Sequence, residues 1–391
     1  MNRDKVFGVI KNALWNTPVE VTPQEWPTVY KQLSVHGVLS LANGRMDDYE
    51  LLQNVYDRWC NALGRQINRW YTIAEAGGEL MQLLNSRGLD IAVLKGMAAA
   101  QYYPEPTLRV SSDVDIYVRP EDFDRTYHIM LEAGYELEYD ENFVTYHYSL
   151  KKDGVVYELH KHPAGMRDND KYLAEVFADA IGRTKVIECG GYSAQVFPDM
   201  ENGLVLLLHI VKHFEGGLSL KQIVDWMMFV DKCLDDDSYA AGFGKLVVRA
   251  KLETVTKNVT RFCQKYLGLR DTITWCRDAD EEAVDALAGY IMSRVDIVTK
   301  SSAGDWKTRA YKSRIKRVLS KPVWCMKKLQ SGGMEHWEAA KKCALLRPFA
   351  WLYYTGYLIK NVFVNRKHVS EQMAIGRRDQ KVVDMMKIYR K

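Results

Sequence analysis

Two carboxylates one residue apart, Asp113 and Asp115, lie in an apolar stretch that predicts a β-strand. Successive side chains of a strand point to opposite faces, so the carboxylates share one face while Val114 and Ile116 share the other. Like charges held this close repel each other. A divalent cation with oxygen ligands, such as Mg²⁺, would neutralise them. An exposed acidic strand that binds no metal is the simpler alternative.

The segments on both sides favour phosphate chemistry. Upstream, the apolar run Ile91–Leu94 predicts a strand that leads directly into Lys95-Gly96 and a helix start at Met97. A tight turn into a helix N-terminus presents backbone N–H groups, and together with a lysine it can hold phosphate. Downstream, the alternating segment Val155–His160 predicts another strand, on which Glu158 offers a third carboxylate.

Two pairs of histidines could also do chemistry. His160 and His162 follow Glu158 on the same strand face. They could bind a transition metal, but beside hard oxygen ligands we expect them to contact the nucleotide or acceptor, or to lie exposed. His209 and His213 are spaced to share one helix face and could chelate zinc. No glutamate follows His209 as in the His-Glu-x-x-His proteases, so histidines without a metal are the favoured interpretation.

These residues resemble a known family, the uncharacterised nucleotidyltransferases of the polymerase-β-like nucleotidyltransferase superfamily. The resemblance rests on Lys95-Gly96, Tyr103-Pro104, Arg109, Ser112 to Asp115, and Glu158 to His160. It is sharp over about residues 88–165 and weaker, at the level of helical pattern, over about 200–230. The sequence departs from the superfamily pattern at Met97, where a serine is expected after the glycine, and in a longer interval before Asp113.

The resemblance implies transfer of a nucleoside monophosphate from an NTP to a hydroxyl group, with two Mg²⁺ or Mn²⁺ ions as cofactors. The implied catalytic residues and metal ligands are Asp113, Asp115 and Glu158, of which Glu158 could also accept the hydroxyl proton. The implied nucleotide-binding residues are Lys95, Gly96, Arg109 and Ser112. A local pairing of Arg109 with an acid such as Glu105 is the alternative for that residue. Lys221 and Asp225, on a later predicted helix, could touch the acceptor.

The predicted fold class is α+β, with a small mixed β-sheet nucleotidyltransferase core (an α/β core) flanked by N-terminal and C-terminal helical regions. Hydrophobic periodicity predicts four regions. Residues 1-86 form an N-terminal helical region, 87-198 the catalytic core, 199-299 a helical domain, and 300-391 a basic, aromatic-rich helical C-terminal region. Within the core, Asp153-Gly154 predicts a tight hairpin turn between two strands.

Cysteine usage and hydropathy bear on location. The seven cysteines are odd in number and scattered, with no Cys-x-x-Cys, which is typical of reduced thiols. No apolar run reaches the ~18 residues that a membrane span requires. Charges interrupt the apolar residues of the N-terminus, unlike a signal peptide. A cytoplasmic protein is therefore expected.

The net charge of +4 conceals two parts of opposite sign. Residues 300–391 contain 22 Lys and Arg against 6 Asp and Glu, whereas residues 1–299 contain 32 against 44. Aromatic residues such as Trp306, Trp324 and Trp351 interleave with these basic residues. Three interpretations compete: a surface for an anionic partner such as RNA or a phosphorylated precursor, contact with an anionic membrane surface through residues 349–364, and charges that are simply solvated.

The sequence thus predicts a metal-dependent nucleotidyltransferase that acts on a small molecule, sugar or glycan precursor. A nucleotidyltransferase acting on RNA or protein, as a toxin would, is the enzyme alternative, and the basic C-terminal region permits it. A non-catalytic nucleotide-binding or nucleic-acid-binding protein on the same fold is the alternative of a different class. The three clustered carboxylates argue against it, because a protein without catalysis has no use for their mutual repulsion. Which NTP is used, the acceptor and the oligomeric state do not follow from these residues.

Overall fold

The computed structural model describes residues 3–138, 147–167 and 170–300, with shorter stretches at 330, 337, 339, 344–356 and 380–389. The chain forms two compact units. The first comprises Met1–Asp296 together with Met385–Lys391, and the second comprises Ile297–Asp384. The domain boundaries predicted after residues 86, 198 and 299 stay predictions.

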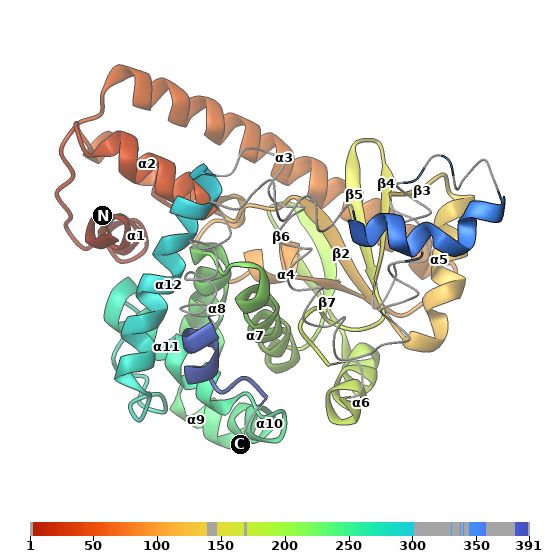
Figure 1. Cartoon of the computed structure of the whole chain (residues 1–391). Coiled ribbons are helices and arrows are strands. Elements are labelled where there is room, and N and C mark those ends of the chain that lie inside the picture. The colour runs from red at the N-terminus through yellow and green to blue at the C-terminus, as the bar shows by residue number, and fades with distance from the viewer. Residues whose placement is uncertain are drawn as a thin grey trace. The chain divides into compact units, whose positions relative to one another are not determined.

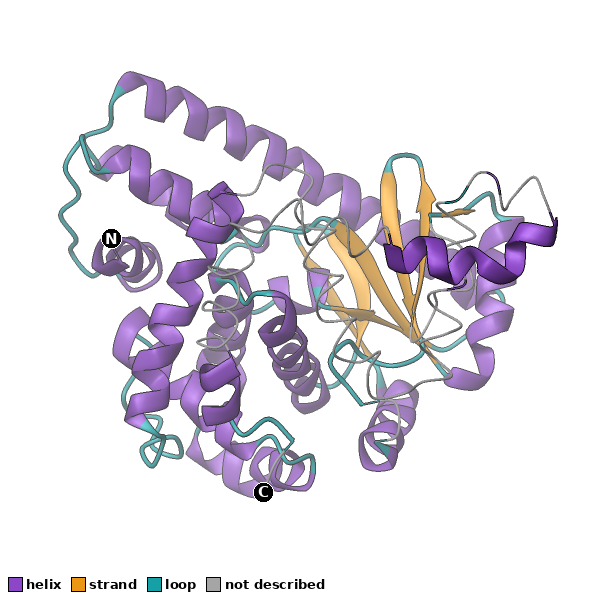
Figure 2. Ribbon diagram, in the orientation of Figure 1, coloured by secondary structure: helices purple, strands orange, loops and turns teal. Residues whose placement is uncertain are grey.

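A five-stranded mixed sheet lies within the first unit and is drawn in orange in Figure 2. Its strands are β1 Ile91–Leu94, β2 Asp113–Val118, β3 Glu136–Leu137, β4 His147–Lys152 and β5 Val155–His160, in the order β1-β2-β5-β4-β3. Strands β2 and β5 are parallel, and the other pairs are antiparallel. The small mixed sheet among helices confirms the predicted α+β fold class.

The sheet has an apolar face and a polar face. On the apolar face, strand residues pack in one core with helices α3 Gln53–Ser86 and α5 Phe123–Glu132. The strand residues at the centre of this core are Val114, Ile116, Tyr157 and Leu159. Figure 1 shows α3 running from the helical part of the unit to the sheet. Burial of this face leaves the alternate residues of β2 and β5 for the polar face, as the period of two predicts.

Two tight hairpins set the register of the strands. Asp153 and Gly154 connect β4 to β5 with φ angles of 50° and 76°. Gly190 and Gly191 connect β6 Lys185–Cys189 to β7 Tyr192–Val196 with φ angles of 59° and 85°. Positive φ at both central residues matches the twist of paired strands and favours Asp-Gly and Gly-Gly. The hairpin predicted at Asp153-Gly154 is confirmed.

The remaining helices complete the first unit. Their bounds are α1 Arg3–Trp15, α2 Trp26–Val35, α4 Gly96–Ala100, α6 Lys171–Ala180, α7 Asp199–Gly216, α8 Leu220–Cys233, α9 Asp236–Ser238, α10 Gly244–Arg249, α11 Glu253–Leu267 and α12 Glu281–Lys300. Helix α1 packs on α11, where the ring centroids of Phe7 and Phe262 lie 5.8 Å apart. The indole of Trp15 donates to the Leu267 carbonyl at 2.7 Å. The N-terminal helices therefore share a core with the helices that follow the sheet.

The loop that follows β5 lies against α7 and against the chain's C-terminal residues. Gly165 has φ 94°, and a Cβ there would lie 2.0 Å from the Leu208 carbonyl oxygen, so only glycine permits this approach. The Tyr389 hydroxyl donates to the Gly165 carbonyl at 2.5 Å. The Arg167 guanidinium lies 4.0 Å from the centroid of the Tyr389 ring. These contacts hold the loop that follows β5 against α7 and against Tyr389.

Part of the second unit is described. Residues 344–356 are helical, and the ring of Tyr353 stacks on that of Trp337 with centroids 5.0 Å apart. Most of the basic C-terminal region lies outside the described residues, and so do residues 357–364 of the stretch 349–364 that was predicted to contact a membrane. Among the helices that are described, none is long and apolar enough to cross a membrane.

Candidate active site

Asp115 and Glu158 stand side by side on the polar face of the sheet. They are register partners on the parallel strands β2 and β5, so their side chains leave the same face at adjacent positions. Asp115 is 2% exposed, whereas Glu158 is 20% exposed. One carboxylate of this pair is therefore enclosed by protein and the other can be reached from outside.

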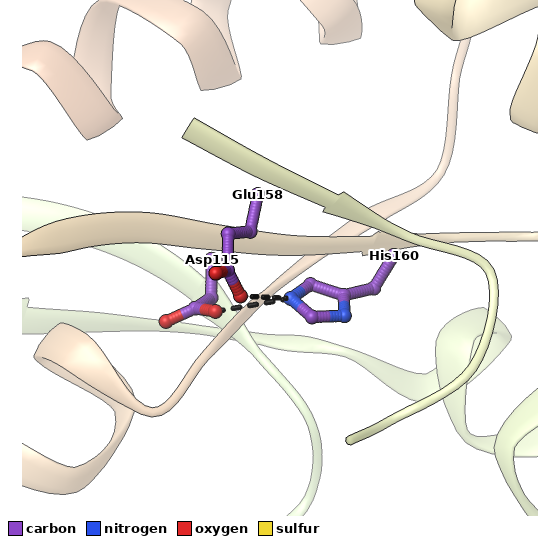
Figure 3. Close-up of side chains that lie close together, drawn as sticks. All are labelled: Asp115, Glu158 and His160. Atoms are coloured by element: carbon purple, nitrogen blue, oxygen red, sulfur yellow. Dashed lines mark hydrogen bonds and ion pairs between the residues drawn. The ribbon is translucent and has the colours of Figure 1, made fainter. Parts of the chain in front are cut away.

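His160 lies within hydrogen-bonding distance of both carboxylates, as Figure 3 shows. Its Nε2 is 3.0 Å from Asp115 Oδ1 and 3.1 Å from Glu158 Oε2, and the ring is fully buried. Burial lowers the pKa of His160, but hydrogen bonds to Asp115 and Glu158 outweigh it and raise this pKa overall. Burial raises the pKa of Glu158, but the His160 hydrogen bond and Lys95 hold it well below its usual value.

His147, on β4, stacks on His160. The two residues are cross-strand partners, and their ring centroids lie 5.2 Å apart. Burial and the neighbouring His160 lower the pKa of His147 to about 4, so His147 is neutral at pH 7. The stacked pair combines a neutral imidazole with one that favours the proton. The neutral ring supports the orientation of His160 toward the carboxylates.

Lys95 enters the same cluster from the turn between β1 and α4. Its Nζ lies 2.5 Å from Asp115 Oδ1 and 3.8 Å from Glu158 Oε2. Burial lowers the pKa of Lys95, but Asp115 and Glu158 outweigh it and raise this pKa above its ordinary value. The backbone of Lys95 has φ 50° and ψ −120°, a conformation that suits glycine. Such backbone strain costs about 1–3 kcal/mol and is found mostly at functional sites.

The other residues predicted on these segments lie nearby. Asp113 shares the strand face of Asp115, is half-buried, and accepts a hydrogen bond from the Ser112 hydroxyl at 3.1 Å. Gly96 begins α4 with φ 27° and is buried. Among the described residues, ligand atoms within 4.8 Å of one another belong to Asp115, Glu158 and His160, and Asp113 is outside this group. The role of Asp113 as a metal ligand stays a prediction.

Arg109 is engaged by a partner far away in the sequence. Its Nε and Nη2 donate to the two carboxylate oxygens of Asp225 at 2.9 and 2.8 Å. Asp225 also accepts from the Tyr103 hydroxyl at 2.7 Å, and Arg109 Nη1 donates to the Ser111 hydroxyl at 2.9 Å. Both members of the ion pair are at most 2% exposed. The local ion pair predicted as an alternative, with an acid such as Glu105, is replaced by the pair with Asp225. Triphosphate binding by Arg109 stays a prediction.

Positive charge surrounds the carboxylate cluster. Lys221, at the start of α8, has no hydrogen-bond or ion-pair partner among the described residues for its ammonium group. Burial, with repulsion from Arg109, lowers the pKa of Lys221 to about 8. Burial, with repulsion from Lys95, likewise lowers the pKa of His209 on α7 well below its ordinary value. His209 is therefore neutral at pH 7, whereas Lys221 keeps its charge, and that positive charge near the cluster favours an anionic ligand.

The donor set fits a divalent cation. Two carboxylates and one imidazole are ligands that Mn²⁺ accepts, and the carboxylates alone suit Mg²⁺. The Lys95 ammonium already lies against both carboxylates, which shows that this position stabilises a cation. For His160 to serve as a ligand, its Nε2 must release the proton that it shares with the carboxylates. Asp115, Glu158 and His160 are thus the residues that could hold a metal.

The pair His209 and His213 forms a contact of its own. The two Nε2 atoms lie 2.9 Å apart, so one ring donates to the other. Among the described residues, the pair belongs to no group of three potential metal ligands. The sequence-based preference for histidines without a zinc ion stays a prediction. His162 lies just beyond β5 and is half-buried.

The sequence predicted strands β2 and β5 but not the contacts that His160 and Arg109 make. It placed Asp115 and Glu158 on neighbouring strands and His160 on the face of Glu158, but favoured a nucleotide contact or exposure for His160. The spacing of two residues after Glu158 was the available signal for a third ligand. Asp225 lies 116 residues from Arg109, and no local pattern indicates that pairing.

The sequence was also compared with known protein families and with curated protein sequences. Residues 22–268 match the model of a family described as uncharacterised nucleotidyltransferases. No curated protein sequence matches the chain.

Three solved structures are similar to parts of the chain. The solution structure of the antibiotic-resistance factor ANT(2'')-Ia has 13% identity and TM-score 0.34, and the match covers 46% of this chain and 93% of that one. The crystal structure of ANT(2'')-Ia in complex with adenylyl-2''-tobramycin has 14% identity and TM-score 0.30, covering 46% and 94%. An antigenic nucleotidyltransferase-like protein from Paracoccidioides brasiliensis has 14% identity and TM-score 0.29, covering 51% and 92%. Because the family model spans well over half of the sequence, the chain belongs to the family of uncharacterised nucleotidyltransferases.

Proposed function

We propose that this nucleotidyltransferase is metal-dependent and transfers a nucleoside monophosphate from an NTP to a hydroxyl acceptor. The observation that carries the proposal is the alignment of Asp115 and Glu158 across two parallel strands, with His160 against both. Two adjacent acids repel each other, and a divalent cation with oxygen ligands would relieve that repulsion. Lys95 at the strand-to-helix turn and Lys221 on α8 bring positive charge that suits the phosphates of the nucleotide.

The proposed reaction uses the difference in exposure between the two acids. The acceptor oxygen attacks the α-phosphorus, the bond from that phosphorus to the bridging oxygen breaks, and pyrophosphate leaves. Glu158 is the partly exposed acid, so we assign it the proton of the acceptor hydroxyl. Asp115, enclosed by protein, keeps its position, and Asp113 adds a carboxylate on the same strand face. A bound Mg²⁺ or Mn²⁺ would neutralise phosphate charge and make the hydroxyl more acidic.

The proposed nucleotide contacts are those predicted from the sequence: Lys95, Gly96, Arg109 and Ser112. Gly96 follows Lys95 at the start of α4, and the Ser112 hydroxyl donates to Asp113. Two Arg109 donors are occupied by Asp225. We add Lys221, whose ammonium lacks an anionic partner among the described residues. ATP is our first choice of NTP for a screen.

The proposed acceptor is a hydroxyl on a small molecule, sugar or glycan precursor. Transfer to RNA or protein is the second candidate, and it depends on the basic region 300–391, most of which lies outside the described residues. A non-catalytic nucleotide-binding protein remains the alternative from another class. We also propose a cytoplasmic location, which the free thiols of the described residues support.

NTP binding and turnover, with and without Mg²⁺ or Mn²⁺, test the proposal. The wild type is compared with the double variant Asp113→Asn plus Asp115→Asn. We expect metal-dependent NTP binding in the wild type and at least a hundredfold loss, about 2.7 kcal/mol, in the double variant, because the neutral amides no longer attract the cation. Circular dichroism and thermal unfolding verify that the variant is folded.

Asp237→Asn, which neutralises an exposed carboxylate on α9, is the matched control and should bind like the wild type. If folded wild-type protein bound none of the four NTPs in the presence of metal, the enzymatic proposal would be wrong. If the double variant bound and turned over NTP like the wild type, the chemistry would lie elsewhere.

A further inference from the structure

We infer that Lys95 is an internal counter-ion that competes with the metal for Asp115 and Glu158, and that nucleotide phosphates release it. The inference rests on the proposed function and adds a role that phosphate binding alone does not give. In the free protein the Lys95 ammonium fills the cation position. In the loaded protein the metal takes that position, and Lys95 turns to the phosphates. Metal and nucleotide then bind cooperatively.

The contact between Lys95 and Asp115 supports this competition. Asp115 Oδ1 lies 2.5 Å from Lys95 Nζ and 3.0 Å from His160 Nε2, so two nitrogens already share one oxygen. A Mg²⁺ ion would bind such an oxygen at about 2.0–2.1 Å. An ammonium left on the same oxygen would then lie within about 5 Å of a double positive charge, where repulsion is strong in a buried site. The metal and the Lys95 ammonium cannot both keep Asp115.

The position of the Lys95 charge points the same way. The ammonium lies 2.5 Å from Asp115 Oδ1 and 3.8 Å from Glu158 Oε2, so it offsets negative charge on both carboxylates. A metal at these carboxylates gains less while the ammonium stays than after it leaves. The phosphates of an NTP would offer the Lys95 ammonium a new anionic partner near the turn between β1 and α4. Because coupling is reciprocal, nucleotide binding strengthens metal binding and metal strengthens nucleotide binding.

The backbone of Lys95 makes the inference testable. At φ 50° a side chain is strained, yet this position carries lysine, and the next residue, Gly96, also has positive φ. Lys95→Gly removes the ammonium and suits the backbone conformation, so it leaves the turn intact. Lys95→Met removes the charge, keeps most of the side-chain volume and retains the strain. The two variants separate the effect of charge from that of the backbone.

Mn²⁺ binding to nucleotide-free protein is the decisive measurement, followed through the paramagnetic resonance signal of free Mn²⁺. We expect Lys95→Gly and Lys95→Met to bind Mn²⁺ at least tenfold more tightly than the wild type, because the competing charge is gone. Lys151→Met, which removes a positive charge at an exposed position on β4, is the matched control, and we expect less than a threefold change. Addition of a non-hydrolysable NTP analogue should tighten Mn²⁺ binding more in the wild type than in Lys95→Gly.

Unchanged or weaker Mn²⁺ affinity in folded Lys95→Gly would overturn the inference, as would an equal gain in Lys151→Met. Glu158→Gln separates this failure from that of the proposed function. If wild-type Mn²⁺ binding did not depend on Glu158, the metal site itself would be misplaced. If binding depended on Glu158 but not on competition with Lys95, only the counter-ion role would fall.

A measurement on the wild type covers the case in which the Lys95 variants do not fold. Lysine acylation, read by mass spectrometry of the peptide that contains Lys95, reports whether the ammonium is held by the carboxylates. We expect slow acylation in the free protein, at least threefold faster acylation with Mg²⁺ alone, and renewed protection when the NTP analogue is added. Acylation of Lys95 that Mg²⁺ leaves unchanged would overturn the inference.

Discussion

The first unit contains two clusters of charged side chains that differ in how far they are closed to solvent. In one, Arg109 and Asp225 pair through two parallel hydrogen bonds, and Tyr103 and Ser111 satisfy further polar atoms. In the other, Asp115 and Glu158 meet on adjacent strands beside cations. The first cluster is closed, with both charged groups at most 2% exposed, whereas Glu158 in the second is 20% exposed.

The difference concerns how completely each cluster is satisfied. A bidentate arginine–carboxylate pair uses its donors and acceptors on each other, so it fixes α8 against the loop before β2 and offers little to a ligand. Two adjacent carboxylates repel each other, and Lys95 offsets this repulsion from a position that a metal ion could also take. A buried ion pair alone is therefore weak evidence for a functional site. A partly open group of acids is stronger evidence.

The largest effect should come from opening the closed cluster. Arg109→Met leaves Asp225 buried without its partner, so we expect the free energy of unfolding to fall by about 3–5 kcal/mol. Urea denaturation measures this change. Arg119→Met, which removes a more exposed pairing with Asp90, is the matched control and should cost less than about 1 kcal/mol.

A small loss of stability in Arg109→Met would change the interpretation of the closed cluster. If Arg109→Met were nearly as stable as the wild type but bound NTP much more weakly, then Arg109 would leave Asp225 to bind phosphate. The sequence-based prediction that Arg109 contacts the triphosphate would gain its support from that outcome.

A smaller effect of opposite sign is expected at Lys221. Its pKa is lowered to about 8 by burial and by Arg109, so at pH 7 the folded protein keeps an unfavourable charge. Lys221→Met should raise the free energy of unfolding by about 1 kcal/mol at pH 7, since one pKa unit is worth about 1.4 kcal/mol and partial exposure reduces the gain. The same variant should bind NTP more weakly.

The pH dependence of the free energy of unfolding tests whether the Lys221 charge causes this effect. Between pH 8 and the ordinary lysine value of 10.5, the unfolded chain binds the Lys221 proton and the folded protein does not, so wild-type stability rises with pH there. The advantage of Lys221→Met should shrink across this window, as followed by denaturation at pH 7, 8.5 and 10. Lys151→Met, at an exposed position on β4, should show neither effect. A constant difference across pH would mean that the Lys221 charge is not the cause.

The smallest effect on stability is expected at the rim of the open cluster. The Ser112 hydroxyl donates to Asp113 in an exposed position, so Ser112→Ala should change the free energy of unfolding by less than about 0.5 kcal/mol. If Ser112 binds the nucleotide, NTP affinity should fall by about fivefold, or roughly 1 kcal/mol, as titration calorimetry would measure. Unchanged affinity would limit Ser112 to orienting Asp113.

Local patterns were sufficient for much of the fold. The alternation around Asp113 and Glu158 predicted β2 and β5, and Asp153-Gly154 predicted the turn before β5, because side-chain period and turn conformation are local properties. The order of strands in the sheet, with β5 between β2 and β4, depends on which apolar faces meet. That choice is made by long-range packing against α3.

The candidate site was predictable to the extent that its geometry is local. Asp115 and Glu158 share a face by alternation, and His160 continues that alternation. The direction of the Lys95 side chain depends on the positive φ of its turn, which a lysine in the sequence does not indicate. The Arg109–Asp225 pair joins residues that are 116 positions apart, so local sequence patterns could not predict it.

The contact of Tyr389 with the loop after β5 has a practical consequence for topology. Residues 385–391 belong to the first unit, so the second unit is an insertion held at both ends rather than a free tail. A stop codon after residue 296 would remove the basic region together with the Tyr389 hydroxyl that bonds Gly165. Replacing residues 297–384 by a flexible linker would keep that bond, and shortening the closed loop adds little entropic cost. Excision and truncation are therefore different operations on this chain.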